Sequence, residues 1–447
     1  MGFSLAYVGC SDFIFSGAAA VTTSDLVGLR IKTVRRQRGL SQAQLAHPEL
    51  SDSYVSLIES GKRTPTPAVL ELLANKLDCS LSYLINGVTA EQMEDIELAL
   101  GYARLALENG EVAEARTRFA ELLGNSNLAG LTALRQEAEF GLALALEAGG
   151  DLDQAISIML RLREEELPAE RNIEVAVALC RAYRESEQLG QAVEVGEQLL
   201  SGIARQPWTD LLVELGATLL AAYYERGDML RARQFAAELL NAADALGTPR
   251  SIVAANWNAS ITARVTGHND EAVAFAERAL AVQMEHGQPR NTARMRFAYI
   301  RTRLRTGSVD AATAREMLLA SIKEYEQTST STIDQAMVYN ELACAEYMTQ
   351  DLDQAAEHAV TARDLLPKYG HVLGADANLL LGRIYGAAGR AEEGRAHTAG
   401  VKEWLDPLPN SRRSASTWYA TAETMEQLGD ADGAVAAYQR ALACAGL

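Results

Sequence analysis

Several features that mark other protein classes are missing from this sequence. The five cysteines are scattered, with no C-x-x-C pair and no cluster with histidine, which argues against a disulfide framework or a zinc site. No apolar run reaches the roughly 18 residues that a membrane span needs. A phosphate-binding glycine loop, an H-E-x-x-H helix and a nucleophile elbow are also absent. We therefore expect a cytoplasmic protein that is not an enzyme and uses no metal or cofactor.

Aromatic residues make up only 6% of the 447 positions, whereas alanine and leucine are abundant, and this bias favours helices over sheets. The length exceeds that of one compact core, so several units or an extended array are expected. The net charge of −18 is uneven, with residues 24–87 at +2 and residues 88–447 at about −19. A basic module on an acidic body is compatible with phosphate binding at one end. Residues 1–23 are interpreted as a disordered leader or a misassigned start.

Residues 25–86 divide into five short helices with start and stop signals. Gly39 ends the first helix, and Ser41 with Gln44 forms a capping box that begins the second. Pro48 stops the second helix, and Gly61 closes the third. Leu45, Val55, Ile58 and Leu73 are expected core positions. The first predicted helix runs from about Asp25 to Arg38, the third from Asp52 to Ser60 and the fifth from Ser80 through Ile85. The second begins at Ser41, and the fourth begins at Thr66 and Pro67.

This module resembles the Cro/repressor-type helix-turn-helix of the XRE family, a five-helix, lambda-repressor-like fold. The resemblance rests on Arg38-Gly39-Leu40-Ser41-Gln42, Leu45-Ala46 and the run from Tyr54 to Pro65. It implies that the third helix enters the major groove of double-stranded DNA. The stretch before Val55 is about one residue shorter than the family pattern, which leaves the start of the third helix open. The predicted DNA contacts are Gln42, Asp52, Ser53, Tyr54, Ser56, Lys62 and Arg63.

The third helix lacks arginine and glutamine, which are the strongest readers of bases. The alternative is therefore a degenerate module that has lost DNA binding.

A second pattern recurs over residues 90–447. A turn residue is followed five positions later by a small residue, in nine units separated by 37 to 43 residues, which predicts a helical solenoid. The pattern is similar to the tetratricopeptide repeat (TPR), which implies a right-handed solenoid of helical hairpins. A period near 40 rather than about 34 predicts longer helices. The nine pairs are Gly110/Ala115, Gly150/Ala155, Glu187/Ala192, Gly227/Ala232, Gly267/Ala272, Gly307/Ala312, Gln350/Ala355, Gly389/Gly394 and Gly429/Ala434.

In such repeats the first helix of each hairpin lines a concave surface. Register along these helices places five arginines and several aromatics on that surface, which predicts a site for an extended ligand with an anionic group. The predicted effector contacts are Trp257, Arg264, Arg294, Phe297, Arg301, Arg305, Asn340, Tyr347 and Arg383. Alternatively, the arginines are solvated or pair with Glu214, Glu225 and other acids of adjacent repeats. Trp257 and Tyr347 could equally be core residues between repeats.

The layout as a whole resembles the RRNPP regulators, cytoplasmic receptors for short signalling peptides in quorum sensing. The resemblance implies a homodimer in which a peptide shifts the two DNA-binding modules. Our first hypothesis is a sequence-specific DNA-binding transcriptional regulator controlled by a short peptide or another small effector. The competing hypothesis is a protein-interaction scaffold whose repeat array docks a protein partner.

Overall fold

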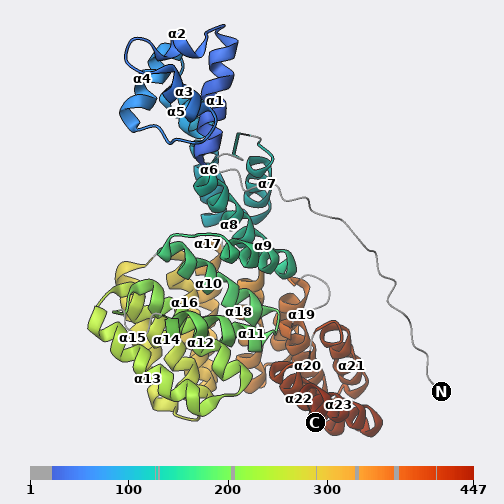
Figure 1. Cartoon of the computed structure of the whole chain (residues 1–447). Coiled ribbons are helices and arrows are strands. Elements are labelled where there is room, and N and C mark those ends of the chain that lie inside the picture. Colours follow the sequence, from blue (N-terminus) through green and yellow to red (C-terminus); the bar gives the residue numbers. More distant parts are fainter. Residues whose placement is uncertain are drawn as a thin grey trace, which may run out of the picture. The chain divides into compact units, whose positions relative to one another are not determined.

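A computed structural model of the chain describes residues 23–125, 127–128, 131–202, 207–287, 289–327, 332–366, 372–408 and 410–446. Within these ranges the structure consists of 23 α-helices without a β-strand, which confirms the all-α prediction (Figure 1). The prediction for residues 1–22 lies outside the described residues. None of the described helices is long and apolar enough to cross a bilayer.

The chain divides into two compact units. The first consists of Met1–Ala103 with Arg118–Ala138, and the second of Arg104–Thr117 with Glu139–Leu447. The division passes through the first helical hairpin of the predicted array and through the helix that follows it, rather than between the DNA-binding module and the array.

The N-terminal module has the five predicted helices. Serine or threonine side chains cap α2 to α5, and Ser41 with Gln44 forms the predicted capping box. The four expected core residues are fully buried. The helices are α1 (Thr23–Gln37), α2 (Gln42–Ala46), α3 (Asp52–Glu59), α4 (Pro67–Leu77) and α5 (Leu81–Asn86).

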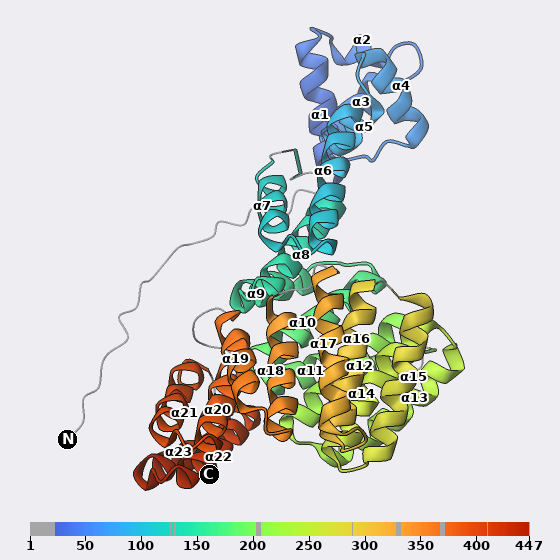
Figure 2. The same cartoon turned by 180° about the vertical axis from the view of Figure 1, so that it is seen from behind.

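Eighteen further helices follow in the described part of the chain, two for each of the nine predicted turn residues. From α9 to α23, sequence neighbours in the second unit pack against one another (Figure 2). The helices are α6 (Ala90–Glu108), α7 (Val112–Leu123), α8 (Thr132–Ala148), α9 (Leu152–Glu164), α10 (Ala169–Glu185), α11 (Leu189–Gly202), α12 (Asp210–Arg226), α13 (Met229–Leu246), α14 (Pro249–Val265), α15 (Asn269–His286), α16 (Pro289–Arg305), α17 (Ala311–Gln327), α18 (Thr332–Met348), α19 (Leu352–Asp364), α20 (Val372–Ala387), α21 (Ala391–Leu405), α22 (Arg412–Gln427) and α23 (Ala431–Cys444).

All nine predicted turn residues have a left-handed backbone. Seven are glycines, and the other two, Glu187 (φ 60°) and Gln350 (φ 65°), adopt this conformation despite their side chains. At each turn the following N–H donates to the carbonyl five residues earlier, as Asp228 does to Tyr223 at 2.9 Å. This is the hydrogen bond of a Schellman motif, so each first helix ends in the same way.

The small residue after the turn is buried in eight of the nine units, but the sixth prediction is wrong. Ala312 is exposed, and Ala314 is the fully buried residue that packs at this position. The connection from Gly307 is two residues longer than the others, because Asp310 caps the next helix by accepting the Thr313 N–H at 2.9 Å. The inserted cap shifts the register of α17.

Two contacts in the second unit join hairpins that are five apart. The guanidinium of Arg290, at the start of α16, packs on Gly110 in the first turn, where a Cβ would lie 2.9 Å from Nη1. In the same way, Arg412 at the start of α22 packs on Gly227, the turn after α12. Since α12 also contacts α22, the array meets itself after five hairpins.

Candidate nucleic-acid interface and effector site

Helix α3 presents the predicted base-reading residues. Ser51 caps it by accepting the Tyr54 N–H, so the helix begins at Asp52 and the open question of register is settled. Asp52, Ser53 and Ser56 are exposed, and Tyr54 is half-buried. The guanidinium carbon of Arg63 lies 5.4 Å from the centroid of the Tyr54 ring. The predicted residues of α3 and of the following loop therefore share one end of the module.

Gln42 has a partner inside the module. Its Nε2 donates to Glu59 at 2.8 Å, and Arg35 binds the same carboxylate with Nε at 2.5 Å and Nη2 at 2.9 Å. Burial raises the pKa of Glu59, but the hydrogen bonds from Arg35 and Gln42 outweigh it and leave that pKa below its usual value. This buried network ties α1, α2 and α3 together, so Gln42 has a structural role beside its predicted phosphate contact.

The basic residues of the module fall into two groups. Arg30 donates to the Ile85 carbonyl at 2.6 Å, and Lys76 donates to the His47 carbonyl at 2.7 Å, so these two hold the fold together. Lys62 and Arg63 are exposed, and neither makes an ion pair within the described ranges. Two of the exposed cations without an ion pair in the described ranges, Lys62 and Arg63, therefore lie next to α3, and a third, Arg36, lies on α1.

Three of the predicted effector arginines pair with acids of the next hairpin. Arg305 binds Glu341 with Nε at 2.7 Å and Nη2 at 2.9 Å, and Arg301 approaches the same carboxylate at 3.4 Å. Arg294 binds the buried Asp334 at 3.0 Å through Nε. The pairing alternative is confirmed for these arginines. Arg383 instead donates to Thr424 Oγ1 at 3.0 Å.

The same pairing recurs earlier in the array, on first helices. Arg184 of α10 lies 3.1 Å from Glu225 of α12, and Arg250 of α14 binds Glu214 of α12 at 2.7 Å. Burial raises the pKa of Glu225 to about 7, although Arg184 and Arg413 oppose that shift. Together these pairs form an arginine–carboxylate ladder, which we define as Arg184–Glu225, Arg250–Glu214, Arg294–Asp334 and Arg301/Arg305–Glu341.

Arg264 differs from the other four predicted arginines, because its side chain has neither an ion pair nor a hydrogen bond to a described residue. It is half-buried on α14 and makes no ion pair with any described residue. Burial lowers the pKa of its guanidinium, and the nearby charges of Arg301 and Arg305 lower it further. By contrast, the hydrogen bond to Glu341 raises the pKa of Arg305. The surroundings of Arg264 therefore favour an added negative charge.

The other predicted effector residues have different surroundings. Phe297 is 4% exposed and packs edge-on against Tyr325 at a centroid distance of 6.2 Å, so it lies in the core between α16 and α17 rather than on the surface predicted for the effector. The register of α16 turns this side chain toward α17. Tyr347 packs partly in the core between α18 and α19, and Trp257 is half-buried. Asn340 is 7% exposed, and its Oδ1 has no hydrogen-bond partner among the described residues.

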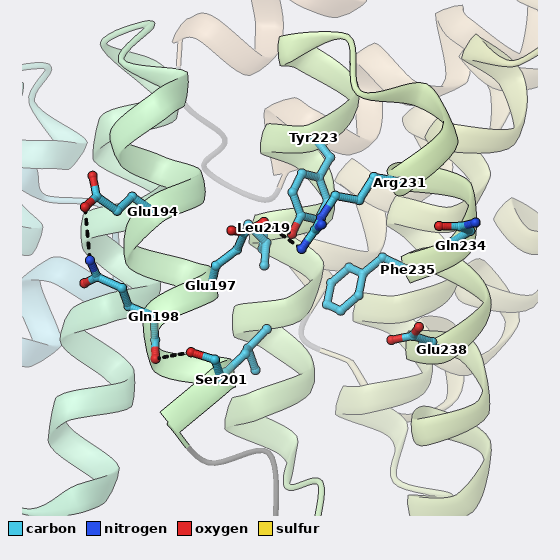
Figure 3. A pocket seen from close by; sticks show the side chains of 11 residues that line it. Glu194, Glu197, Gln198, Ser201, Leu219, Tyr223, Arg231, Gln234, Phe235 and Glu238 are labelled. Carbon is cyan, nitrogen blue, oxygen red and sulfur yellow. Dashed lines mark hydrogen bonds and ion pairs between the residues drawn. The ribbon is translucent and has the colours of Figure 1, made fainter.

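A pocket of about 570 Å³ was not anticipated from the sequence. It lies among α11, α12 and α13, and Figure 3 shows Tyr223, Arg231 and Glu197 converging in it. The Tyr223 hydroxyl donates to Glu197 at 2.7 Å, and Arg231 lies 2.8 Å from the same carboxylate and over the Tyr223 ring. The cation in this pocket, Arg231, is therefore already paired with a carboxylate of the pocket itself, Glu197. No spacing in the sequence brings these three residues together.

Comparison with known proteins finds relatives of the N-terminal module. The HTH_3 family model, described as helix-turn-helix, matches residues 31–84. The HTH-type transcriptional regulator PrpR of Mycobacterium tuberculosis is 32% identical over 116 residues, which cover 25% of this chain and 24% of the relative. The immunity repressor protein of Bacillus phage phi105 is 38% identical over 72 residues, 16% of this chain and 50% of the relative. The chain thus spans half or less of these two relatives.

Solved structures align with a larger part of the chain. PlcR of Bacillus thuringiensis, in complex with the peptide PapR7 and DNA, aligns over 58% of this chain and 97% of its own, at 16% identity and a TM-score of 0.34. NprR with its cognate peptide NprX aligns over 68% and 87%, at 13% identity and a TM-score of 0.48. At these scores the alignments establish neither ligand nor function for this chain. The sequence match and the four capped helices α2 to α5 agree on the N-terminal module alone, where residues 31–84 match the helix-turn-helix family model.

Proposed function

We propose that the chain is a sequence-specific DNA-binding transcriptional regulator whose helix α3 reads base edges in the major groove. The observation that carries this proposal is the exposed first turn of α3 in a module that matches the helix-turn-helix model. Asp52 can accept a hydrogen bond from cytosine N4, and Ser53 and Ser56 can bond to several bases. Lys62 and Arg63 supply the phosphate contacts.

Fluorescence anisotropy with duplex DNA tests this assignment. We expect Lys62→Ala/Arg63→Ala to weaken binding to all sequences, and to reduce the slope of log affinity against log salt by about 2. Ser53→Ala should instead change which sequence is preferred. Arg38→Ala is the matched control, because Arg38 pairs with Asp78 at 3.0 Å on the module surface. A wild-type chain without salt-sensitive DNA binding would refute the proposal.

The effector input is the second part of the proposal. We infer that an anionic group, such as the C-terminal carboxylate of a short peptide, binds at Arg264. In support, Arg264 has no acidic partner in the described part of the array and lies in the field of Arg301 and Arg305. A carboxylate there would gain charge-assisted hydrogen bonds. Asn340, with its unpaired Oδ1, is a candidate for an amide N–H of the same ligand.

Thermal shift with short synthetic peptides tests this site. Peptides with a free C-terminus should raise the Tm of the wild-type chain, and the same peptides with an amidated C-terminus should raise it less. Arg264→Gln should remove the difference between the two series. Arg278→Gln should keep it, because Arg278 is exposed on a second helix and pairs with Asp244 at 2.6 Å. Equal responses of the free and amidated series would rule out a carboxylate at Arg264.

A protein-interaction scaffold remains the second candidate. It is favoured by the ladder, because Arg294, Arg301 and Arg305 are already engaged by carboxylates. In that case the array would show no peptide-dependent shift, and a stoichiometric protein would co-purify with the full chain. DNA binding by α3 is compatible with both candidates, so the anisotropy and thermal-shift experiments answer separate questions.

A further inference from the structure

The pocket among α11, α12 and α13 takes no part in the proposed function. Its volume of about 570 Å³ lies in the range that small-molecule sites occupy. Its walls are the second helices α11 and α13, whereas the predicted effector contacts lie on first helices from α14 to α20. Tyr223 lines the pocket, but the next residue of α12, Tyr224, lies in the field of Arg184 and Arg264. The pocket is therefore distinct from the anion site proposed at Arg264.

The lining of the pocket carries an excess of negative charge. Glu194, Glu197 and Glu238 supply three carboxylates, and Arg231 supplies the one cation among the described lining residues. Arg231 lies 2.8 Å from Glu197 and neutralises that carboxylate. Burial raises the pKa of Tyr223 to about 12, so its hydroxyl stays protonated and donates to Glu197 without adding a charge. Glu194 and Glu238 are left without a cation among these lining residues.

The two unbalanced carboxylates stand on opposite walls. Glu194 is exposed on α11 and Glu238 is exposed on α13, and Figure 3 shows one on each side of the pocket. The lining also includes the apolar side chains of Leu200, Leu219 and Phe235. An alkyl chain packs favourably on such side chains, and an ammonium group is attracted to the face of an aromatic ring. The pocket thus fits a molecule with cationic ends and an apolar stem.

We propose that this pocket binds an aliphatic diamine or polyamine, whose ammonium groups pair with Glu194 and Glu238. Each pair would be a charge-assisted hydrogen bond, which is roughly twice as strong as one between neutral groups. One flexible molecule would make two such pairs, whereas a lysine side chain of a protein partner brings a single ammonium group. An anion would meet the free carboxylates, because Arg231 is engaged by Glu197. The bound amine would join α11 to α13, the second helices of adjacent hairpins.

Isothermal titration calorimetry of the full chain with spermidine tests the site. At an ionic strength of about 0.15 M the Debye length is about 8 Å, so diffuse attraction to a chain of net charge −18 is largely screened. We expect saturable binding of one spermidine per chain. Binding of n-butylamine, which has one ammonium group, should be weaker by about tenfold or more. Absence of saturable spermidine binding, or equal affinity for the two amines, would overturn the proposal.

Paired glutamine variants distinguish the pocket from the general acidity of the array. Glu194→Gln/Glu238→Gln should raise the dissociation constant of spermidine by about tenfold or more, since it removes both charges and keeps the side-chain shape. Glu277→Gln/Glu316→Gln is the matched control, because it makes the same charge change at exposed positions of α15 and α17, outside the pocket. All four positions are exposed, so both variants should keep the wild-type helix content. Equal losses of affinity in the two variants would show diffuse attraction and contradict a site.

A capped lysine tripeptide separates a free amine from a protein side chain. It presents one ammonium group on an alkyl stem, so it should bind as weakly as n-butylamine. If it binds as tightly as spermidine, the pocket accepts a basic side chain of a partner protein, and the proposed ligand class is wrong.

Hydrogen exchange locates the bound amine. Spermidine should slow exchange in α11 and α13, which it joins, and leave exchange in α16 and α18 unchanged. The same pattern should appear in Arg264→Gln, since the pocket does not depend on the effector site. Protection confined to first helices would place the amine at the carboxylates of the ladder and overturn the proposal.

Discussion

The N-terminal module and the repeat array use arginine in different ways. In the module, Arg35 and Glu59 form one buried pair that joins three helices, while Lys62 and Arg63 remain exposed beside α3. In the array, half-exposed arginines bind carboxylates one hairpin away, and the pairing repeats from α10 to α18. A basic residue next to a predicted site is therefore a poor guide to ligand binding until its partners are known.

The largest expected effect concerns the buried pair of the module. Arg35→Ala leaves the Glu59 carboxylate, which is 2% exposed, without its cation. We expect a loss of about 3–5 kcal/mol in the local unfolding free energy of residues 23–87. Hydrogen exchange of these residues in the full chain measures it. Arg38→Ala removes an exposed pair and should cost less than about 1 kcal/mol. Equal losses of unfolding free energy in the two variants would show that the buried pair stabilises the module no more than the exposed pair does.

An intermediate effect is expected in the ladder. Glu341 is 2% exposed and is the only described acid that pairs with both Arg301 and Arg305. Glu341→Gln should destabilise the array by about 1–3 kcal/mol, because two cations near Arg264 lose their counter-charge. The same variant should bind anions more tightly in this region. Chemical denaturation in low and in high sulfate measures both the loss of stability and its recovery on anion binding. If sulfate does not restore the stability of the variant, the result argues against an anion site there.

The smallest effect is a pH dependence centred on Glu225. Its pKa rises from 4.5 to about 7 in the folded chain, so the folded state holds the proton that the unfolded state has lost. The contribution of Glu225 to the unfolding free energy therefore falls as pH rises from about 4.5 to about 7, by about 1–2 kcal/mol after allowance for partial exposure. Tm measured against pH should show a flatter profile for Glu225→Gln. Identical profiles would contradict the shift.

Local signals were enough to predict the helices. The capping box at Ser41 and the glycines at the turns identify helix ends, because hydrogen bonds within a few residues determine them. All nine turns were predicted in this way, whereas the start of α3, left open by the sequence, is given by the Ser51 cap. The Ala312 error shows the limit of this approach, since an added cap at Asp310 shifted the register where spacing alone gave no warning.

Site residues were harder to predict, because their environment depends on neighbours about 40 positions away. Whether Arg294 or Arg264 has an acidic partner is decided by the next first helix, and Phe297 turned toward α17 rather than toward a ligand. The pocket with Tyr223 and Arg231 needs three helices in contact. The sequence of one repeat does not show whether an arginine has an acidic partner, whether an aromatic side chain is buried or where a pocket forms.

Arg290 packs on Gly110, and Arg412 packs on Gly227. Strain can therefore pass directly between hairpins that lie far apart in the sequence. In an open solenoid, strain in the ninth hairpin would reach the fourth only by passing through every hairpin between them. Here the two are direct neighbours, as are the sixth and the first. Deleting one hairpin would therefore misalign each arginine with its glycine. The packing therefore constrains the number of repeats in this chain as well as the repeat period.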